Sequence, residues 1–217
     1  RHEGKARRSL GQIAQMSGNL VDARRELSRS VDIFRELHDD IELAASLRER
    51  GFAEVFGGSL ADADWLLGEA EALSEQLNDR RGRAWVRQHQ AWVAFLSGDL
   101  ELAEKRLLLA SGEFSDLGDR SGSNWATGLL AYIRFFTLRF DEAEVLAHAV
   151  RSEGLELGER WSPAMMDSLL ASIRLWSGNF ADAERLSRRA LSQFRSLDDS
   201  FGLVQALGPR TRALVAL

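Results

Sequence analysis

The four histidines are the side chains best suited to metal binding or acid–base catalysis, and their spacing argues against both. They are His2, His38, His89 and His148. No two stand at the spacing of metal ligands or in an HExxH motif, and His89 has no neighbouring carboxylate in sequence to orient it as a general base. The chain has no Cys, so thiolate metal sites, cysteine nucleophiles and disulfides are excluded. We therefore predict no metal site, no cofactor and no enzymatic activity.

The charged residues argue against binding to nucleic acids or membranes. The 217 residues include 28 Lys and Arg and 33 Asp and Glu, a net charge of −5, and the two signs are interspersed along the chain. A general nucleic-acid binder needs a basic excess gathered on one face. No apolar run approaches the roughly 18 residues of a membrane span, and no signal peptide opens the chain. We expect a soluble, cytoplasmic chain without direct nucleic-acid or membrane partners.

A seven-residue phrase recurs along the chain with a period of 40 residues. It reads SGNLVDA at 17–23, GGSLADA at 57–63, SGDLELA at 97–103, TLRFDEA at 137–143 and SGNFADA at 177–183. Twelve residues before each final Ala stands another small residue: Gly11, Gly51, Ala91, Ala131 or Ala171. We expect these two columns of small residues to be buried where paired helices cross. A fixed period of this length predicts a repeat architecture.

Each period contains two stretches whose apolar residues recur at helical steps of three and four. The first helices are predicted at about 3–17, 41–57, 81–97, 121–137, 163–177 and 201–216, and the second at about 20–37, 60–77, 100–117, 140–157 and 180–197. Gly18, Gly58, Gly98 and Gly178 mark the turns inside the hairpins, where glycine tolerates a positive φ. No alternating strand pattern occurs, so the class is all-α.

Three positions depart from this pattern. Leu138 replaces the turn glycine of the fourth period, so we expect that turn to be reshaped. Pro163 suits a first helical position, so the fifth first helix should begin there, after the longest connector. Gly208 and Pro209 should kink or split the final helix.

The repeated columns resemble the tetratricopeptide repeat (TPR). The first unit carries the resemblance in Leu10-Gly11, Gly18-Asn19-Leu20, Ala23, Leu27 and Ser30. The resemblance implies a right-handed α-solenoid of five helical hairpins plus one terminal helix. One repeat domain is expected over 1–217, with repeats at about 1–38, 39–78, 79–118, 119–158 and 159–198 and a terminal helix at 199–217. The long period, with connectors such as Leu117-Gly-Asp-Arg120, is similar to the sensor arms of STAND-type, LuxR-like bacterial transcription regulators.

The resemblance also assigns an unusually aromatic set of residues to the concave face of such a solenoid. The candidate binding residues are Phe52, Trp85, Trp92, Phe95, Trp125, Tyr132, Phe135 and Trp176. Apolar patches of this kind are usually covered by a partner or ligand. The alternative is that they form core between helices, and the column Phe56, Leu96, Phe136 and Trp176 in particular is open to that interpretation.

Two functions fit this surface. The first is a protein–protein interaction scaffold that binds an apolar or amphipathic peptide segment in the aromatic groove. The second is a small-molecule effector-sensing arm of an ATP-dependent transcription regulator, for which Gln88, His89, Gln90, Asn124 and Ser172 supply a thin polar set. The chain starts at Arg1 and ends within an apolar stretch, so we expect a piece of a larger protein. Its expected partners are a protein or peptide, another domain of the parent chain, or a second copy.

Overall fold

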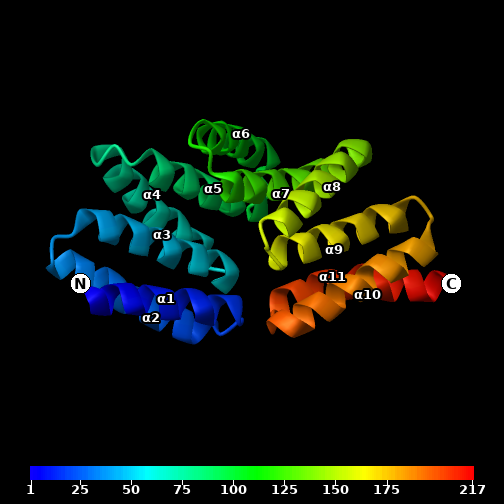
Figure 1. Ribbon diagram of the computed structural model, residues 1–217, viewed down its shortest axis with the longest axis horizontal. Coiled ribbons are helices and arrows are strands. Elements are labelled where there is room, and N and C mark those ends of the chain that lie inside the picture. Colours follow the sequence, from blue (N-terminus) through cyan, green and yellow to red (C-terminus); the bar gives the residue numbers. More distant parts are fainter. The chain divides into compact units, whose positions relative to one another are not determined.

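The computed structural model describes all 217 residues, which form eleven α-helices and no strand (Figure 1). The helices are α1 (His2–Met16), α2 (Leu20–Glu36), α3 (Asp40–Gly57), α4 (Leu60–Gln76), α5 (Arg80–Leu96), α6 (Leu100–Asp116), α7 (Arg120–Phe136), α8 (Phe140–Glu156), α9 (Trp161–Trp176), α10 (Phe180–Leu197) and α11 (Ser200–Ala216). Every predicted helix is present, and each end lies within two residues of its predicted position. The all-α class and the order of five hairpins followed by one helix are confirmed.

The chain divides into two compact units, Arg1–Ser123 and Asn124–Leu217. In the first unit, α1 packs on α2, α3 on α4 and α5 on α6, and each hairpin also packs on the next. In the second unit, α8 packs on α9, α9 on α10, and α11 on both α9 and α10. Within each unit, a helix contacts only helices one or two places away in the chain. This is the contact pattern of stacked helical repeats.

Small residues allow the two helices of a hairpin to approach closely. Ala23, Ala63, Ala103, Ala143 and Ala183 are all fully buried, as expected. A Cβ added at Gly11 would lie 2.5 Å from Cγ of Leu27 and 3.3 Å from the carbonyl oxygen of Ala23. The same addition at Gly51 would lie 2.8 Å from Cγ of Leu67. The two columns of small residues therefore meet at each crossing, which explains why they recur with the period.

The expectation that the turn at Leu138 is reshaped is wrong. Leu138 adopts the positive φ of +62° that Gly98 adopts at +86° in the preceding hairpin. The Leu138 N–H donates to the Phe135 carbonyl at 3.0 Å, and the Arg139 N–H donates to the Arg134 carbonyl at 2.8 Å. The Gly98 turn has the equivalent two bonds. The turn thus keeps its geometry, and the leucine bears a backbone strain of about 1–2 kcal/mol.

Helix α9 begins at Trp161, two residues before the predicted start at Pro163. Pro163 lies in the first turn, where its missing N–H costs no intrahelical hydrogen bond. Side-chain contacts fix the earlier start. The Trp161 Nε1–H donates to a carboxylate oxygen of Asp199 at 2.7 Å, and the Trp161 ring stacks on Trp125 with centroids 4.8 Å apart.

Helix α11 is continuous from Ser200 to Ala216, so of the two outcomes expected at Gly208 and Pro209, a kink or a split, the split does not occur. Pro209 lies inside the helix and is buried. Because proline has no N–H, the Gln205 carbonyl four residues earlier lacks its intrahelical donor.

Ion pairs join neighbouring helices where polar side chains are buried. In the first unit, Arg8 of α1 donates to the Glu42 carboxylate of α3 at 2.8 Å and to the Ser46 hydroxyl at 3.3 Å. In the second unit, Asp167 of α9 is fully buried and pairs with Arg151 of α8 at 2.8 Å and with Arg189 of α10. The carboxylates of Glu42 and Asp167 are thus both paired with arginines from neighbouring helices.

Candidate functional site

The four predicted binding residues of the first unit pack mainly against their own unit. Trp92 is only 6% exposed, and its ring lies 6.0 Å from Phe56 and 6.0 Å from Phe95. Phe52 stacks on His89, with centroids 4.0 Å apart, and Trp85 makes an edge contact with buried Phe114 at 5.1 Å. Phe52, Trp85 and Phe95 are partly buried. The aromatic column of this unit is therefore largely filled by its own side chains.

His89 is a buried, uncharged member of this packing. Burial lowers its pKa to about 3, and the opposing attraction of the Glu49 carboxylate is the smaller effect. A histidine with such a pKa is too weak a base for catalysis near neutral pH. Gln88 is also buried, and neither polar atom of its side chain has a partner. No group of three or more His, Asp or Glu side chains is arranged to hold a metal ion.

In the second unit, Trp125 and Tyr132 are held by contacts with α9. Trp125 stacks on Trp161, as described above. The Tyr132 hydroxyl donates to the Met165 carbonyl at 3.2 Å, and burial raises the pKa of Tyr132 above its ordinary value. Both rings are partly buried. These contacts fix the packing of α7 on the start of α9 and leave the other end of α7 to form the site.

Four aromatic rings follow one another at that other end. Phe136 and Phe135 of α7 make an edge contact at 5.4 Å, Phe135 and Phe140 of α8 lie 5.5 Å apart, and Phe140 stacks on Trp176 of α9 at 6.2 Å. Phe136 is 57% exposed and Trp176 is 64% exposed. We call these four rings the aromatic wall. Its two end members present most of their surface to solvent.

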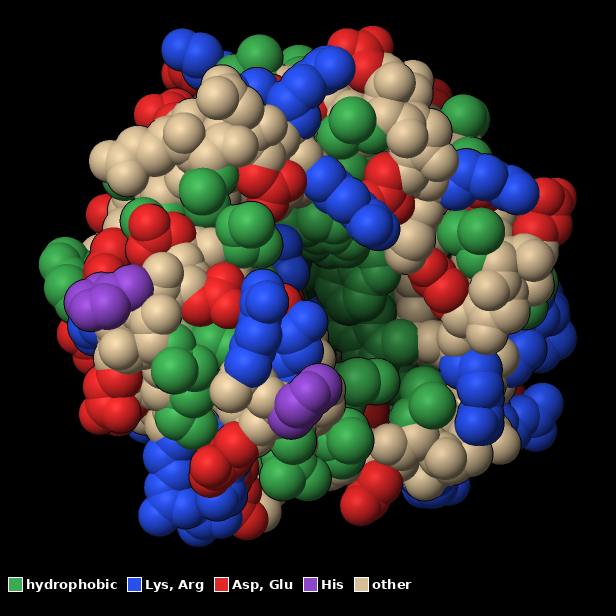
Figure 2. All heavy atoms as spheres, turned by 60° about the vertical axis from the view of Figure 1, so that its left-hand side comes forward, with side chains coloured by type: hydrophobic (Ala, Val, Ile, Leu, Met, Phe, Trp, Pro, Cys, Tyr) green, Lys and Arg blue, Asp and Glu red, His purple; other side chains and the backbone are tan.

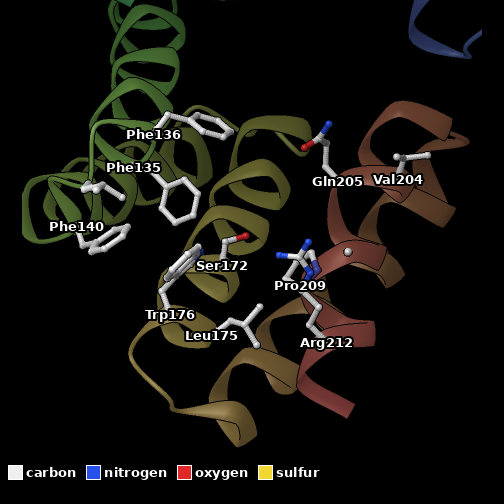
Figure 3. Close-up of a pocket in the computed structure, with 12 residues that line it drawn as sticks. Phe135, Phe136, Phe140, Ser172, Leu175, Trp176, Val204, Gln205, Pro209 and Arg212 are labelled. Atoms are coloured by element: carbon white, nitrogen blue, oxygen red, sulfur yellow. The ribbon is translucent and has the colours of Figure 1, made fainter. Parts of the chain in front are cut away.

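The aromatic wall forms one side of a pocket of about 470 Å³ in the second unit. Figure 3 shows the aromatic side chains of α7, α8 and α9 on one side of the pocket and α11 on the other, with Ser172 between them. The remaining lining residues are Leu138, Leu175, Val204, Gln205, Gly208, Pro209 and Arg212. The Ser172 hydroxyl donates to the Ser168 carbonyl at 3.1 Å, so its oxygen can still accept a hydrogen bond.

The pocket is apolar, with its polar groups concentrated on α11. None of its twelve lining residues is acidic, and Arg212 is its only charged side chain. Elsewhere on the surface, basic and acidic side chains lie interspersed, and no large patch of either sign is visible in the view of Figure 2. The arrangement suits an apolar ligand with a few hydrogen-bonding groups and at most a small negative charge.

The structure brings two of the eight predicted binding residues, Phe135 and Trp176, to this pocket. The other six, Phe52, Trp85, Trp92, Phe95, Trp125 and Tyr132, do not line it. Sequence reasoning missed Phe140 and Arg212, and it left Phe136 open to a core role. The available signal was the Phe at 140, just after the unusual Leu138 turn.

Comparison with solved structures identifies the fold of the chain. No protein-family model and no curated protein sequence matches the chain. A putative kinesin light chain of Podosopora anserina with TPR-like repeats is similar in structure, with 18% identity and a TM-score of 0.58 over 89% of this chain and 93% of that one. The chain has the TPR-like helical-repeat fold.

Two further structures with this fold have higher TM-scores. BtubC from P. vanneervenii has 19% identity and a TM-score of 0.65 over 91% of this chain and 88% of its own. The Rap conjugation gene regulator of plasmid pLS20, solved in complex with a Phr peptide, has 15% identity and a TM-score of 0.71 over 99% of this chain and 62% of its own. At these identities the likeness concerns the TPR-like fold alone. None of the eleven helices has the length and apolarity needed to span a membrane.

Proposed function

We propose that this TPR-like chain is a protein-interaction scaffold that binds an apolar or amphipathic peptide segment, with Phe135 and Trp176 among its contacts. The observation that carries the proposal is the aromatic wall, whose end members Phe136 and Trp176 are more than half exposed beside an open pocket. Exposed aromatic side chains held rigid by their neighbours are typical binding anchors, because they bury much area and lose little conformational entropy.

The comparisons support a peptide as the ligand class. The Rap regulator of plasmid pLS20, which shares the fold, was solved with a Phr peptide bound. A stack of helical hairpins presents side chains from successive first helices along one surface, which suits an extended or helical segment. Here α7, α9 and α11 supply side chains to the pocket from three such helices.

Peptide display on the immobilised chain tests the proposal. We expect enrichment of peptides with large apolar residues, and loss of their binding in the variants Phe136→Ala and Trp176→Ala. Trp65→Ala is the matched control, because Trp65 is similarly exposed on α4 and lies outside the pocket. Melting curves of all three variants should match the parent chain, since the replaced rings are exposed. Selected peptides that bind Trp176→Ala as well as the parent would refute the proposed site.

The alternative is a small-molecule effector, as in the sensor arm of a transcription regulator. The pocket volume of about 470 Å³ favours keeping this candidate, because it lies within the usual range of small-ligand sites, roughly 300–1,000 Å³. A thermal-shift screen of small apolar acids and sugars against the parent chain and Trp176→Ala distinguishes the two. Stabilisation by a small molecule that Trp176→Ala abolishes, without any enriched peptide, would favour the effector.

A further inference from the structure

We infer that the pocket of the second unit selects a peptide in which a large apolar side chain stands close in sequence to an Asp or Glu, and that Arg212 binds this carboxylate. The inference rests on the proposed function and specifies its ligand. The apolar side chain would lie against the aromatic wall, and the acidic one would lie along α11. Three features of α11 carry the argument.

The first feature is the charge of Arg212. Its guanidinium has no hydrogen bond or ion pair within the chain, and no acidic residue lines the pocket with it. Most arginines of this unit are paired: Arg210, two residues away, lies 3.6 Å from Glu184, and Arg174 pairs with Glu144. Arg212 therefore offers an unmatched positive charge at an apolar pocket, where a ligand carboxylate would complement it.

The second feature is where that charge lies. In Figure 3 the Arg212 side chain runs alongside Pro209 toward the middle of the pocket, across from Trp176 of the aromatic wall. Arg212 is exposed beside this apolar surface, so a ligand can reach its guanidinium directly from solvent. A guanidinium can also hold a carboxylate through two parallel hydrogen bonds. A peptide with an acidic side chain beside an apolar one could thus contact Arg212 and the aromatic wall at the same time.

The third feature is the Gln205 side chain on α11, which can hydrogen-bond to the backbone of a bound peptide. The Gln205 side-chain amide has no partner within the chain and carries both a donor and an acceptor, the complement of a peptide group. Seven residues of helix separate Gln205 from Arg212, which corresponds to about 10 Å, or about three residues of extended peptide. A peptide whose backbone binds at Gln205 would therefore place its carboxylate about three residues away, at Arg212.

Fluorescence anisotropy with defined peptides tests the inference. The probes are fluorescein-labelled, C-terminally amidated octapeptides of Ala and Ser that carry one Trp and, one to four residues to either side, one Glu. A second set carries Gln in place of Glu. Because the C-terminus is blocked and both sets carry the same dye, the Glu side chain is the only carboxylate that differs between the two sets. The proteins are the parent chain, Arg212→Gln, Arg212→Lys, Trp176→Ala and the control Arg195→Gln, whose arginine is exposed at the end of α10 outside the pocket.

We expect the parent chain to prefer the best Glu peptide over its Gln counterpart by about two- to fivefold, as for an exposed ion pair. Arg212→Gln should abolish this preference, Arg212→Lys should keep part of it, and Arg195→Gln should keep all of it. The preference should shrink as salt is added, because the pair is partly exposed. Trp176→Ala should weaken binding of the Glu and Gln peptides alike.

Two results overturn the inference in distinguishable ways. Equal affinity of the parent chain for Glu and Gln peptides, or an unchanged preference in Arg212→Gln, with binding still dependent on Trp176, removes the acidic requirement and leaves the proposed function standing. Absence of binding by every probe, or binding that Trp176→Ala does not weaken, overturns the proposed site together with the inference.

Discussion

Replacing His89 by Phe should remove a specific acid sensitivity of the first unit. His89 is buried and stacks on Phe52, and burial lowers its pKa to about 3. In the unfolded chain its pKa returns to about 6.5. Between these two values the unfolded chain binds a proton that the folded chain does not. Stability therefore falls as the pH falls below about 6.5, and it is fully retained above that value.

The size of the effect follows from the two pKa values. Lowering the pH from 7.5 to 5.5 should cost the parent chain about 1.4 kcal/mol through His89 alone. The pH of 5.5 is chosen as the lower limit because carboxylates such as Glu42 and Glu26, whose pKa values are lowered by the hydrogen bonds and charges of nearby basic side chains, begin to contribute only in more acidic solution. A phenylalanine keeps the aromatic stack on Phe52 and does not titrate.

Urea denaturation at pH 7.5 and 5.5 measures the difference. The free energy of unfolding should fall by about 1.4 kcal/mol more in the parent chain than in His89→Phe, whatever the variant's stability at pH 7.5. His2→Gln is the control, because it removes an exposed histidine at the N-terminal end. Equal pH dependence in the parent chain and His89→Phe would show that His89 is protonated in the folded state and that the reasoning from burial is wrong.

Three other substitutions test the packing. Trp92→Ala should lower the free energy of unfolding by about 3–5 kcal/mol, because the Trp92 ring is buried. Trp176→Ala should lower it by less than about 1 kcal/mol, because the Trp176 ring is exposed. Similar melting temperatures of the two variants would contradict this difference. Ala103→Leu should cost about 1–3 kcal/mol by overpacking a helix crossing, whereas exposed Ala61→Leu on α4 should cost little in the same urea titration. Leu138→Gly should raise the melting temperature by relieving about 1 kcal/mol of strain at its positive φ, and a lower melting temperature would count against that strain.

The period of the sequence was sufficient to predict the helices, because it records a physical contact. The small side chains at Ala23 and Gly11 recur every 40 residues because the two helices of each hairpin cross there. The errors fell where tertiary contacts override local preference. Leu138 takes a positive φ because the hydrogen bonds of the turn demand it. Trp161 begins α9 early because Asp199 and Trp125 hold its ring, and these partners are distant in sequence.

The candidate site was less predictable than the fold. Helical periodicity shows which residues share a face, but the accessibility of that face depends on what the neighbouring side chains cover. Trp92 and Trp176 both follow the helical pattern, yet Phe56 and Phe95 cover Trp92, while Trp176 is left exposed. Arg212 carried no sequence signal of its own, because its lack of a partner becomes apparent only when the surrounding helices are in place.

The buried ion pairs between helices bear on how a chain of similar repeats assembles in the right order. Hairpins with the same alanine and glycine columns could dock on one another out of sequence at little cost in apolar burial. Asp167 is fully buried and relies on Arg151 and Arg189, whereas the positions 40 and 120 residues earlier carry Thr127 and Leu47. A hairpin docked in the wrong place would leave the Asp167 carboxylate buried without its arginines, which would cost several kcal/mol of stability. The Asp167 junction thus favours the native neighbours of α9 over a misordered hairpin during folding.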